Sequence, residues 1–148
     1  MKSRITKLVF ILFLTSNFTF ARDNNQTQNT NNLANLLVEL ETTIFWNAVA
    51  NEWKYFRVKW LDACKLCNNG QCIAQRMIEF ESYSVAENMN PAWQQRRDAW
   101  IKECELVKTN EQAAKLLLEF ETNVSWNAVK ESWKDRRNNW ITECESVK

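Results

Sequence analysis

Apolar residues in the last third of the chain recur at helical spacing. One stripe advances by three or four residues at a time, which places its members on a single helix face: Val129, Trp133, Arg137, Trp140, Cys144 and Val147. A second stripe lies upstream, out of phase with the first by about one residue: Ala113, Leu117, Phe120 and Val124. The pattern therefore predicts helices on both sides of a break, and no strands.

This pattern repeats with a period of 40 residues. Several positions carry the same residue in all three copies: Ala34, Ala74 and Ala114; Glu39, Glu79 and Glu119; Glu41, Glu81 and Glu121; Trp53, Trp93 and Trp133; Arg57, Arg97 and Arg137; Trp60, Trp100 and Trp140; Cys64, Cys104 and Cys144. We therefore predict an all-α fold of three tandem helical units, at residues 33–72, 73–112 and 113–148.

Small polar residues mark the break inside each unit. In the third unit they are Thr122, Asn123 and Ser125, whose side chains compete for backbone hydrogen bonds and favour helix ends. We predict a helical hairpin in each unit, although a single kinked helix fits the same pattern. Asn90-Pro91 places the break later in the second unit, because proline fits the first turn of a helix.

Short polar segments join one unit to the next. Thr109 and Gln112 have the spacing of a capping box at a helix start. Short links make consecutive helices antiparallel neighbours. Three such hairpins could stack as a solenoid or close into a bundle, and the pattern leaves both arrangements open.

The start of the chain is typical of a secretion signal. Lys2, Arg4 and Lys7 surround the beginning of an apolar run, and Ala21 supplies a small residue for cleavage. We predict a signal peptide over residues 1–21 and an exported, periplasmic or extracellular protein. The apolar run is too short for a stable membrane span.

Residues 22–32 contain no apolar side chain. Such a segment cannot bury enough surface to offset the entropy lost on ordering. We therefore predict that it is a disordered tether, and that the helical domain extends over residues 33–148.

Composition argues against several functional classes. The chain has no histidine and one glycine, which disfavours Ser-His, Cys-His and His-metal chemistry and a phosphate-binding loop. Without residues 1–21 the net charge is slightly negative, because that segment holds basic residues and no acidic ones. This balance disfavours a nucleic-acid partner and a polybasic membrane patch. We expect no cofactor.

The paired glutamates, such as Glu39 and Glu41, could form a general acid and base, as in glycoside hydrolysis. Residues two apart on a helix point to different sides, however. The pair also recurs in all three units, and an active site is seldom triplicated in so small a chain. We interpret these glutamates as partners of arginine, and we expect no enzymatic activity.

The Trp-x3-Arg-x2-Trp-x3-Cys pattern places two indoles and a guanidinium on one helix face. We interpret it as a structural seam, in which the indoles are buried and each arginine is paired with an upstream glutamate: Trp53, Arg57, Trp60, Trp93, Arg97, Trp100, Trp133, Arg137 and Trp140. The alternative is an exposed aromatic face that binds a glycan or a peptide. Trp46 and Trp126 lie at the edge of the seam and are the candidate binding residues.

Five cysteines suit an oxidising compartment and leave one unpaired. Cys67 and Cys72 flank a turn and could close a local loop, and Cys64 with Cys72 is another option. Any two of Cys64, Cys104 and Cys144 could staple neighbouring helices. The odd cysteine would be free and buried or would link two chains as a homodimer. The spacing of Cys64, Cys67 and Cys72 also fits zinc, but export favours disulfides and we expect no metal.

One segment resembles a known family. Ala92-Trp93-x3-Arg97-Asp98-Ala99, followed by Cys104-Glu105, is similar to the closing motif of small exported bacterial lysozyme-inhibitor-type (LprI-like) domains. The resemblance covers about a dozen residues of one unit. The cysteine lies three residues later here, and the threefold repeat is absent from that motif. The resemblance implies a helical, disulfide-bonded, periplasmic or secreted protein that binds another protein.

Together these observations predict an exported, non-enzymatic protein-interaction module, either an inhibitor or an envelope-associated binding protein. The alternative is a carrier whose helices enclose a small apolar molecule in a Trp-lined cavity.

Overall fold

The computed structural model describes residues 24–148, and the predicted signal peptide lies outside this range. The described chain is all-helical, and the β-type pairing within it is limited to isolated bridges. Its first helix covers residues 24–43 and is followed by α2 (Trp53–Lys65), α3 (Gly70–Glu81), α4 (Trp93–Glu105), α5 (Asn110–Asn123) and α6 (Glu131–Glu145). The all-α prediction is therefore confirmed over these residues.

Each 40-residue stretch holds two separate helices, and the alternative of one kinked helix is excluded. The connections contain the 3-10 turns η1 (Trp46–Ala48), η2 (Ala86–Asn88) and η3 (Trp126–Ala128). The prediction of a later break in the second unit was wrong, because α3 already ends at Glu81. Pro91 instead lies in the turn that leads into α4.

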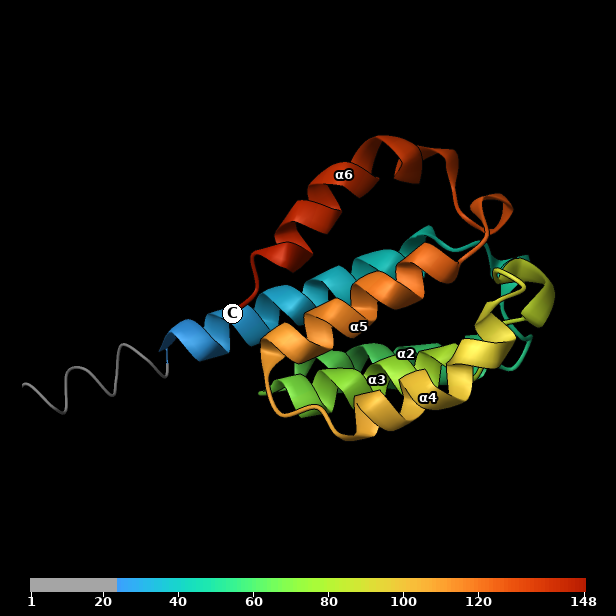
Figure 1. Cartoon of the computed structure of the whole chain (residues 1–148). Coiled ribbons are helices and arrows are strands. Elements are labelled where there is room, and N and C mark those ends of the chain that lie inside the picture. The colour runs from blue at the N-terminus through green and yellow to red at the C-terminus, as the bar shows by residue number, and fades with distance from the viewer. Residues whose placement is uncertain (1–23) are drawn as a thin grey trace, which may run out of the picture.

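The first helix, α3 and α5 form the inner layer, and α2, α4 and α6 lie outside them (Figure 1). Leu37, Met77 and Leu117 occupy the same position in the three inner helices, and all three are fully buried. Phe80 and Phe120 pack edge to face, with ring centroids 6.0 Å apart. Apolar burial along the inner helices thus supplies the core that holds the outer helices.

A tryptophan of each outer helix forms a hydrogen bond with the main chain of an inner helix. The second indole of each stripe donates to a main-chain carbonyl: Trp60 to Arg76 (2.9 Å), Trp100 to Leu116 (3.0 Å) and Trp140 to Leu36 (3.0 Å). The first two acceptors lie in the inner helix that follows. The third lies in the first helix, so α6 is tied to the beginning of the described chain.

The connecting segments show the same order of contacts. Three isolated antiparallel bridges join them: Val49 with Ser84, Met89 with Val124, and Val129 with Ile44. The third bridge again joins the end of the described chain to its beginning. A hydrogen bond from the Asn29 side chain to the Lys148 carbonyl (3.4 Å) joins the first helix to the segment after α6, at the end away from these bridges.

The prediction of a disordered tether over 22–32 was wrong for residues 24–32, which are helical. Thr30 is buried, and its hydroxyl lies 2.9 Å from the Gln26 carbonyl and 3.2 Å from Asn110 Oδ1. The corresponding position in α3 is Gly70, where a Cβ would collide with the backbone of Thr109. Small and polar side chains are therefore required at this crowded junction, and tertiary contacts order a segment that has no apolar residue.

The predicted capping box at the start of α5 is confirmed. Thr109 Oγ1 accepts from the Gln112 backbone N–H, and the Gln112 side chain accepts from the Thr109 N–H. Asn69 caps α3 in the same place by accepting from the Cys72 N–H at 2.8 Å. These caps fix where the inner helices begin.

Candidate functional site

Three buried carboxylates hold the tryptophan and arginine stripe in place. Each accepts from the indole N–H twelve residues ahead: Glu41 from Trp53 (3.0 Å), Glu81 from Trp93 (3.2 Å) and Glu121 from Trp133 (3.1 Å). Each also accepts from the arginine four residues further along: Arg57, Arg97 and Arg137. All three carboxylates are buried and bind the protein's own donors, as structural groups do. Both oxygens of Glu41 and Glu121 are bonded, whereas Oε2 of Glu81 is buried without a hydrogen-bond partner.

The two candidate binding tryptophans lie at the surface. Trp46 is 59% exposed and Trp126 is 52% exposed. The guanidinium of Arg57 lies over the Trp46 ring, and that of Arg137 over the Trp126 ring, each at 5.7 Å. The second copy has Ala86 at this place. The structure thus brings each tryptophan to the arginine of its own unit. The segments that carry the two tryptophans are joined by a hydrogen bond from the Phe45 N–H to the Ala128 carbonyl at 2.9 Å.

Two of the three grooves between an outer helix and the next inner helix are bridged by an arginine. In the second groove, Arg96 binds Glu119 of α5 (2.9 Å from Nη2) and Glu103 of α4 (2.8 Å from Nη1). In the third, Arg136 binds Glu39 of the first helix (2.9 Å) and Glu143 of α6 (2.8 Å). The hydrogen bond from arginine lowers the pKa of Glu103 and of Glu143.

The first groove, between α2 and α3, differs from the other two at the residues that fill them. Phe56 stands where they have Arg96 and Arg136, and Ala63 where they have Glu103 and Glu143. Arg76 replaces a leucine on the inner helix and binds Glu79 at 2.8 Å. The groove therefore lacks the bridging guanidinium.

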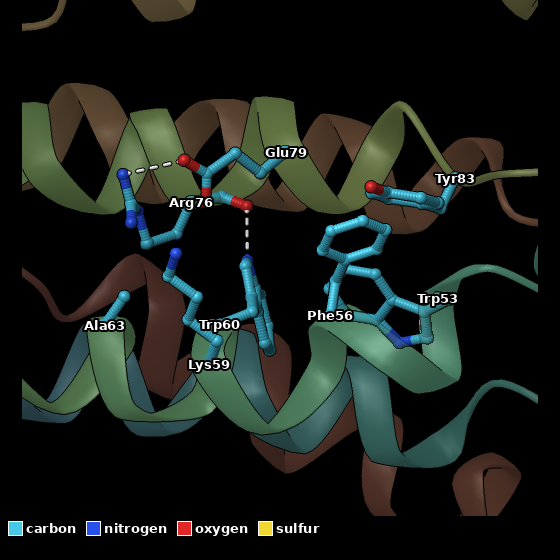
Figure 2. Close-up of a pocket in the computed structure, with 8 residues that line it drawn as sticks. All are labelled: Trp53, Phe56, Lys59, Trp60, Ala63, Arg76, Glu79 and Tyr83. Atoms are coloured by element: carbon cyan, nitrogen blue, oxygen red, sulfur yellow. Dashed lines mark hydrogen bonds and ion pairs between the residues drawn. The ribbon is translucent and has the colours of Figure 1, made fainter.

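A cleft of about 220 Å³ lies in this groove. Hollows also lie beside Arg136 and Glu39 in the third groove, at about 440 Å³, and beside Glu103 and Leu116 in the second, at about 320 Å³. Figure 2 shows the residues that line the cleft in the first groove: Trp53, Phe56, Lys59, Trp60, Ala63, Arg76, Glu79 and Tyr83. Aromatic rings form one end of it, where Phe56 lies 5.6 Å from Tyr83 between centroids. Charged side chains form the other end.

The outer face of α2 also differs from those of α4 and α6. Tyr55, Val58 and Leu66 are 75%, 68% and 82% exposed. Polar residues stand at the positions that match Tyr55, namely Gln95 and Asp135, and at those that match Val58, namely Asp98 and Asn138. Leu66 is matched by Leu106 after α4 and by Ser146 after α6. We call Tyr55, Phe56, Val58 and Leu66 the α2 surface.

The helix α2 is also more positively charged than α4 and α6. It carries four basic residues and one acidic residue, whereas α4 carries three of each and α6 carries three basic and four acidic residues. The α2 surface and its cleft did not enter the sequence prediction, which followed what the copies share. The detectable signal was the set of positions at which one copy departs from the other two.

The cysteines follow only one of the predicted options. Cys67 and Cys72 form a disulfide, with Cα atoms 5.4 Å apart. Cys64, Cys104 and Cys144 are free and buried. The option that two of these three staple neighbouring helices is therefore not realised, because all three remain free thiols within the apolar core. Their burial also leaves none at the surface to link two chains, and the disulfide occupies two of the three sulfurs of the zinc option.

Burial controls the chemistry of the three free thiols. It raises the pKa of Cys64, Cys104 and Cys144 from the ordinary value of 9.0 to about 12. In the native protein they should resist a chromogenic disulfide reagent at pH 8, because the thiolate is the reactive form. In urea without reductant, three thiols should react. Five reactive thiols in urea would contradict the Cys67–Cys72 bond, and fast native reaction would contradict burial.

The raised pKa of the thiols also predicts how the free energy of unfolding changes at alkaline pH. The folded pKa lies above the unfolded one, so the unfolded chain releases these protons first as the pH rises. The free energy of unfolding should therefore be unaffected below pH 9 and should fall between pH 9 and pH 12. Replacement of Cys104 by alanine should reduce that slope, which urea midpoints at several pH values would measure.

Comparisons with protein-family models, with curated proteins and with solved structures find no match to this chain. The resemblance of residues 92–105 to lysozyme-inhibitor-type domains stays a prediction. Among the described residues, no helix is long and apolar enough to cross a membrane, and no cluster of side chains has the makeup of a metal site.

Proposed function

We propose that this protein is an exported, non-enzymatic protein-interaction module, acting as an inhibitor or an envelope-associated binding protein. The observation that carries the proposal is the α2 surface. Large apolar side chains are exposed there at positions where the corresponding helices have mainly polar ones. Exposed apolar patches of this kind mark interaction sites, and aromatic residues are enriched in interface cores.

The proposed scaffold is a closed ring of three tandem helical hairpins. The tryptophan–carbonyl hydrogen bonds and the β-bridges that join one 40-residue unit to the next also join the third unit to the first, through Trp140–Leu36 and Val129–Ile44. A closed scaffold presents its outer helices rigidly. Rigid surfaces lose less conformational freedom when they bind.

The engagement of the buried glutamates supports a non-enzymatic role. Glu41, Glu81 and Glu121 are the most enclosed acidic groups of the described chain, and each binds its own tryptophan and arginine. The Cys67–Cys72 disulfide is compatible with export, because such bonds persist in oxidising compartments.

A carrier of a small apolar molecule is the second candidate, and the cleft lined by Trp53 and Trp60 favours it. Pockets that enclose a whole small ligand measure about 300–1,000 Å³. The Trp-lined cleft is smaller, at about 220 Å³, and the larger hollow beside Arg136, at about 440 Å³, is lined mainly by polar side chains. The Trp-lined cleft fits one inserted side chain better, and for this reason we place the interaction module first.

The test is capture of a partner from the exported fraction by chemical cross-linking to the full chain. A variant with Tyr55→Gln, Val58→Asp and Leu66→Ser takes residues from the matching positions of α4 and α6. It should recover the partner about tenfold less well, since a few central residues dominate most interfaces. Leu106→Ser is the matched control, because Leu106 is a similarly exposed leucine at the same position of α4.

Trp46→Ala and Trp126→Ala test the candidate tryptophans separately. Loss of capture in these variants alone would move the contact from α2 to the exposed tryptophans. Unchanged capture in all of the variants would contradict the interaction module. Ligand-sized mass retained in native mass spectrometry, together with that result, would favour the carrier.

A further inference from the structure

We propose that the cleft between α2 and α3 binds an acidic segment of the partner protein, with an aromatic or large aliphatic side chain in the cleft and a carboxylate beside it at Lys59. The inference rests on the proposed interaction role. It identifies the chemistry that the partner must offer.

The grooves between the outer and the inner helices accommodate large side chains. In the two corresponding grooves, the chain's own Arg96 and Arg136 cross from the outer helix to a glutamate of the next inner helix. In the first groove, Phe56 lies against Tyr83 instead, and the small Ala63 replaces the second glutamate. The first groove therefore has no arginine of its own across it, and it offers an aromatic lining that the other two grooves lack.

The walls of the cleft are suited to an apolar anchor. Trp53, Phe56 and Tyr83 form a cluster of tilted rings, with Trp53 and Tyr83 centroids 5.1 Å apart. The Trp60 N–H is already bound to the Arg76 carbonyl, so this indole contributes its apolar face (Figure 2). An inserted ring or branched chain would therefore meet aromatic surface and no unpaired indole donor.

The charged end of the cleft is suited to a carboxylate. Glu79 is neutralised by Arg76. The Lys59 side chain is exposed, and its ammonium group forms no hydrogen bond or ion pair with any residue of the described range 24–148. Within that range, Nε of Arg76 is buried without a hydrogen-bond partner. The cleft thus has a surplus positive charge at Lys59, and the excess of basic residues along α2 would steer an acidic partner toward it.

A protein segment fits this shape better than a lipid surface does. The apolar rings of the cleft line a concave site, which a projecting side chain can enter. A bilayer binds convex apolar surfaces that enter the headgroup region. Anionic lipid is therefore the contrary outcome of the test.

The test selects short random peptides displayed on phage against the full chain and measures the selected peptides by fluorescence anisotropy. The matched variant combines Phe56→Arg, Ala63→Glu and Arg76→Leu, which introduces the residues that fill the second groove at Arg96, Glu103 and Leu116. Lys59→Ala is a single exposed change that leaves the aromatic walls intact. The urea midpoint of each variant reports whether it is folded.

Selected peptides should share an aromatic or large aliphatic residue next to Asp or Glu. The filled-groove variant should bind them about tenfold more weakly, and replacing their acidic residues with Asn and Gln should weaken binding to a similar extent. Lys59→Ala should weaken binding severalfold, which keeps the test valid if the triple variant does not fold.

Three results would overturn the inference: no selected peptide that depends on the cleft, selected peptides without acidic residues, or cleft-dependent binding to phosphatidylglycerol vesicles with no peptide binding. The proposed function would survive each of them if capture of a partner still depended on Tyr55, Val58 and Leu66. The two proposals therefore fail separately.

Discussion

Replacing Trp140 by alanine should lower the free energy of unfolding by about 3–5 kcal/mol, the usual cost of truncating a fully buried tryptophan. Trp140 is fully buried, packs edge to face on Trp133 with centroids 5.3 Å apart, and donates to the Leu36 carbonyl. The substitution removes the aromatic contact, creates a cavity and leaves that carbonyl without its donor. Urea unfolding followed by far-ultraviolet circular dichroism would measure the loss.

The matched control is Trp100→Ala, because Trp100 has the same burial, the same contact with the preceding indole and the same kind of acceptor in Leu116. If α6 is sealed against the first helix as firmly as α4 is against α5, the two losses should agree within about 1 kcal/mol. A Trp140 variant that loses far less than the Trp100 variant would contradict the closed ring. Trp126→Ala, at the surface, should change stability by about 0.5 kcal/mol or less.

Replacing Glu121 by alanine should cost about 2–4 kcal/mol, from an orphaned buried donor and a small cavity. Glu121 is the common acceptor of the Trp133 indole and the Arg137 guanidinium. The guanidinium is partly exposed and can return to water, whereas the indole N–H cannot. The loss should appear in the urea midpoint.

Glu143→Ala serves as the comparison, since Glu143 also binds an arginine but lies half-exposed at the surface. Ion pairs of that kind contribute about 1 kcal/mol or less. Glu121→Gln should fall between the two, because the amide oxygen can still accept from Trp133. An equal cost for Glu121→Ala and Glu143→Ala would show that the buried carboxylate adds nothing to the scaffold.

The helices were predictable because their signal is local. The stripe through Trp133 and Trp140 and the capping residues Thr109 and Gln112 lie within a few turns of one another, so their spacing alone indicates a helix and its start. The side on which α6 packs depends on contacts more than a hundred residues apart along the chain, such as Trp140 with Leu36. Periodicity carries no information about such contacts.

The beginning of the first helix and the α2 cleft were not predicted, for different physical reasons. Residues 24–32 are polar, and only their tertiary neighbours order them, as Asn110 does for Thr30. The cleft depends on contacts between residues far apart in the sequence, such as Phe56 of α2 with Tyr83, which lies just after α3. A repeat is recognised by the positions that stay the same, whereas the candidate site consists of positions that changed in one copy only.

The contact between Asn29 and Lys148 has a topological consequence. Positions 69 and 109, which correspond to Asn29, follow positions 68 and 108 through an ordinary peptide bond, and Lys148 corresponds to those preceding residues. The described fold is therefore circular apart from one missing bond at this junction. A circular permutant that joined Lys148 to Asn29 and opened the loop at Asn68 would lose residues 24–28, and with them the Gln26 carbonyl that Asn110 contacts. It should keep the remaining helices and the other contacts between them, since such rearrangements are tolerated at exposed loops. The order of the three hairpins along the chain would then be no requirement of the fold.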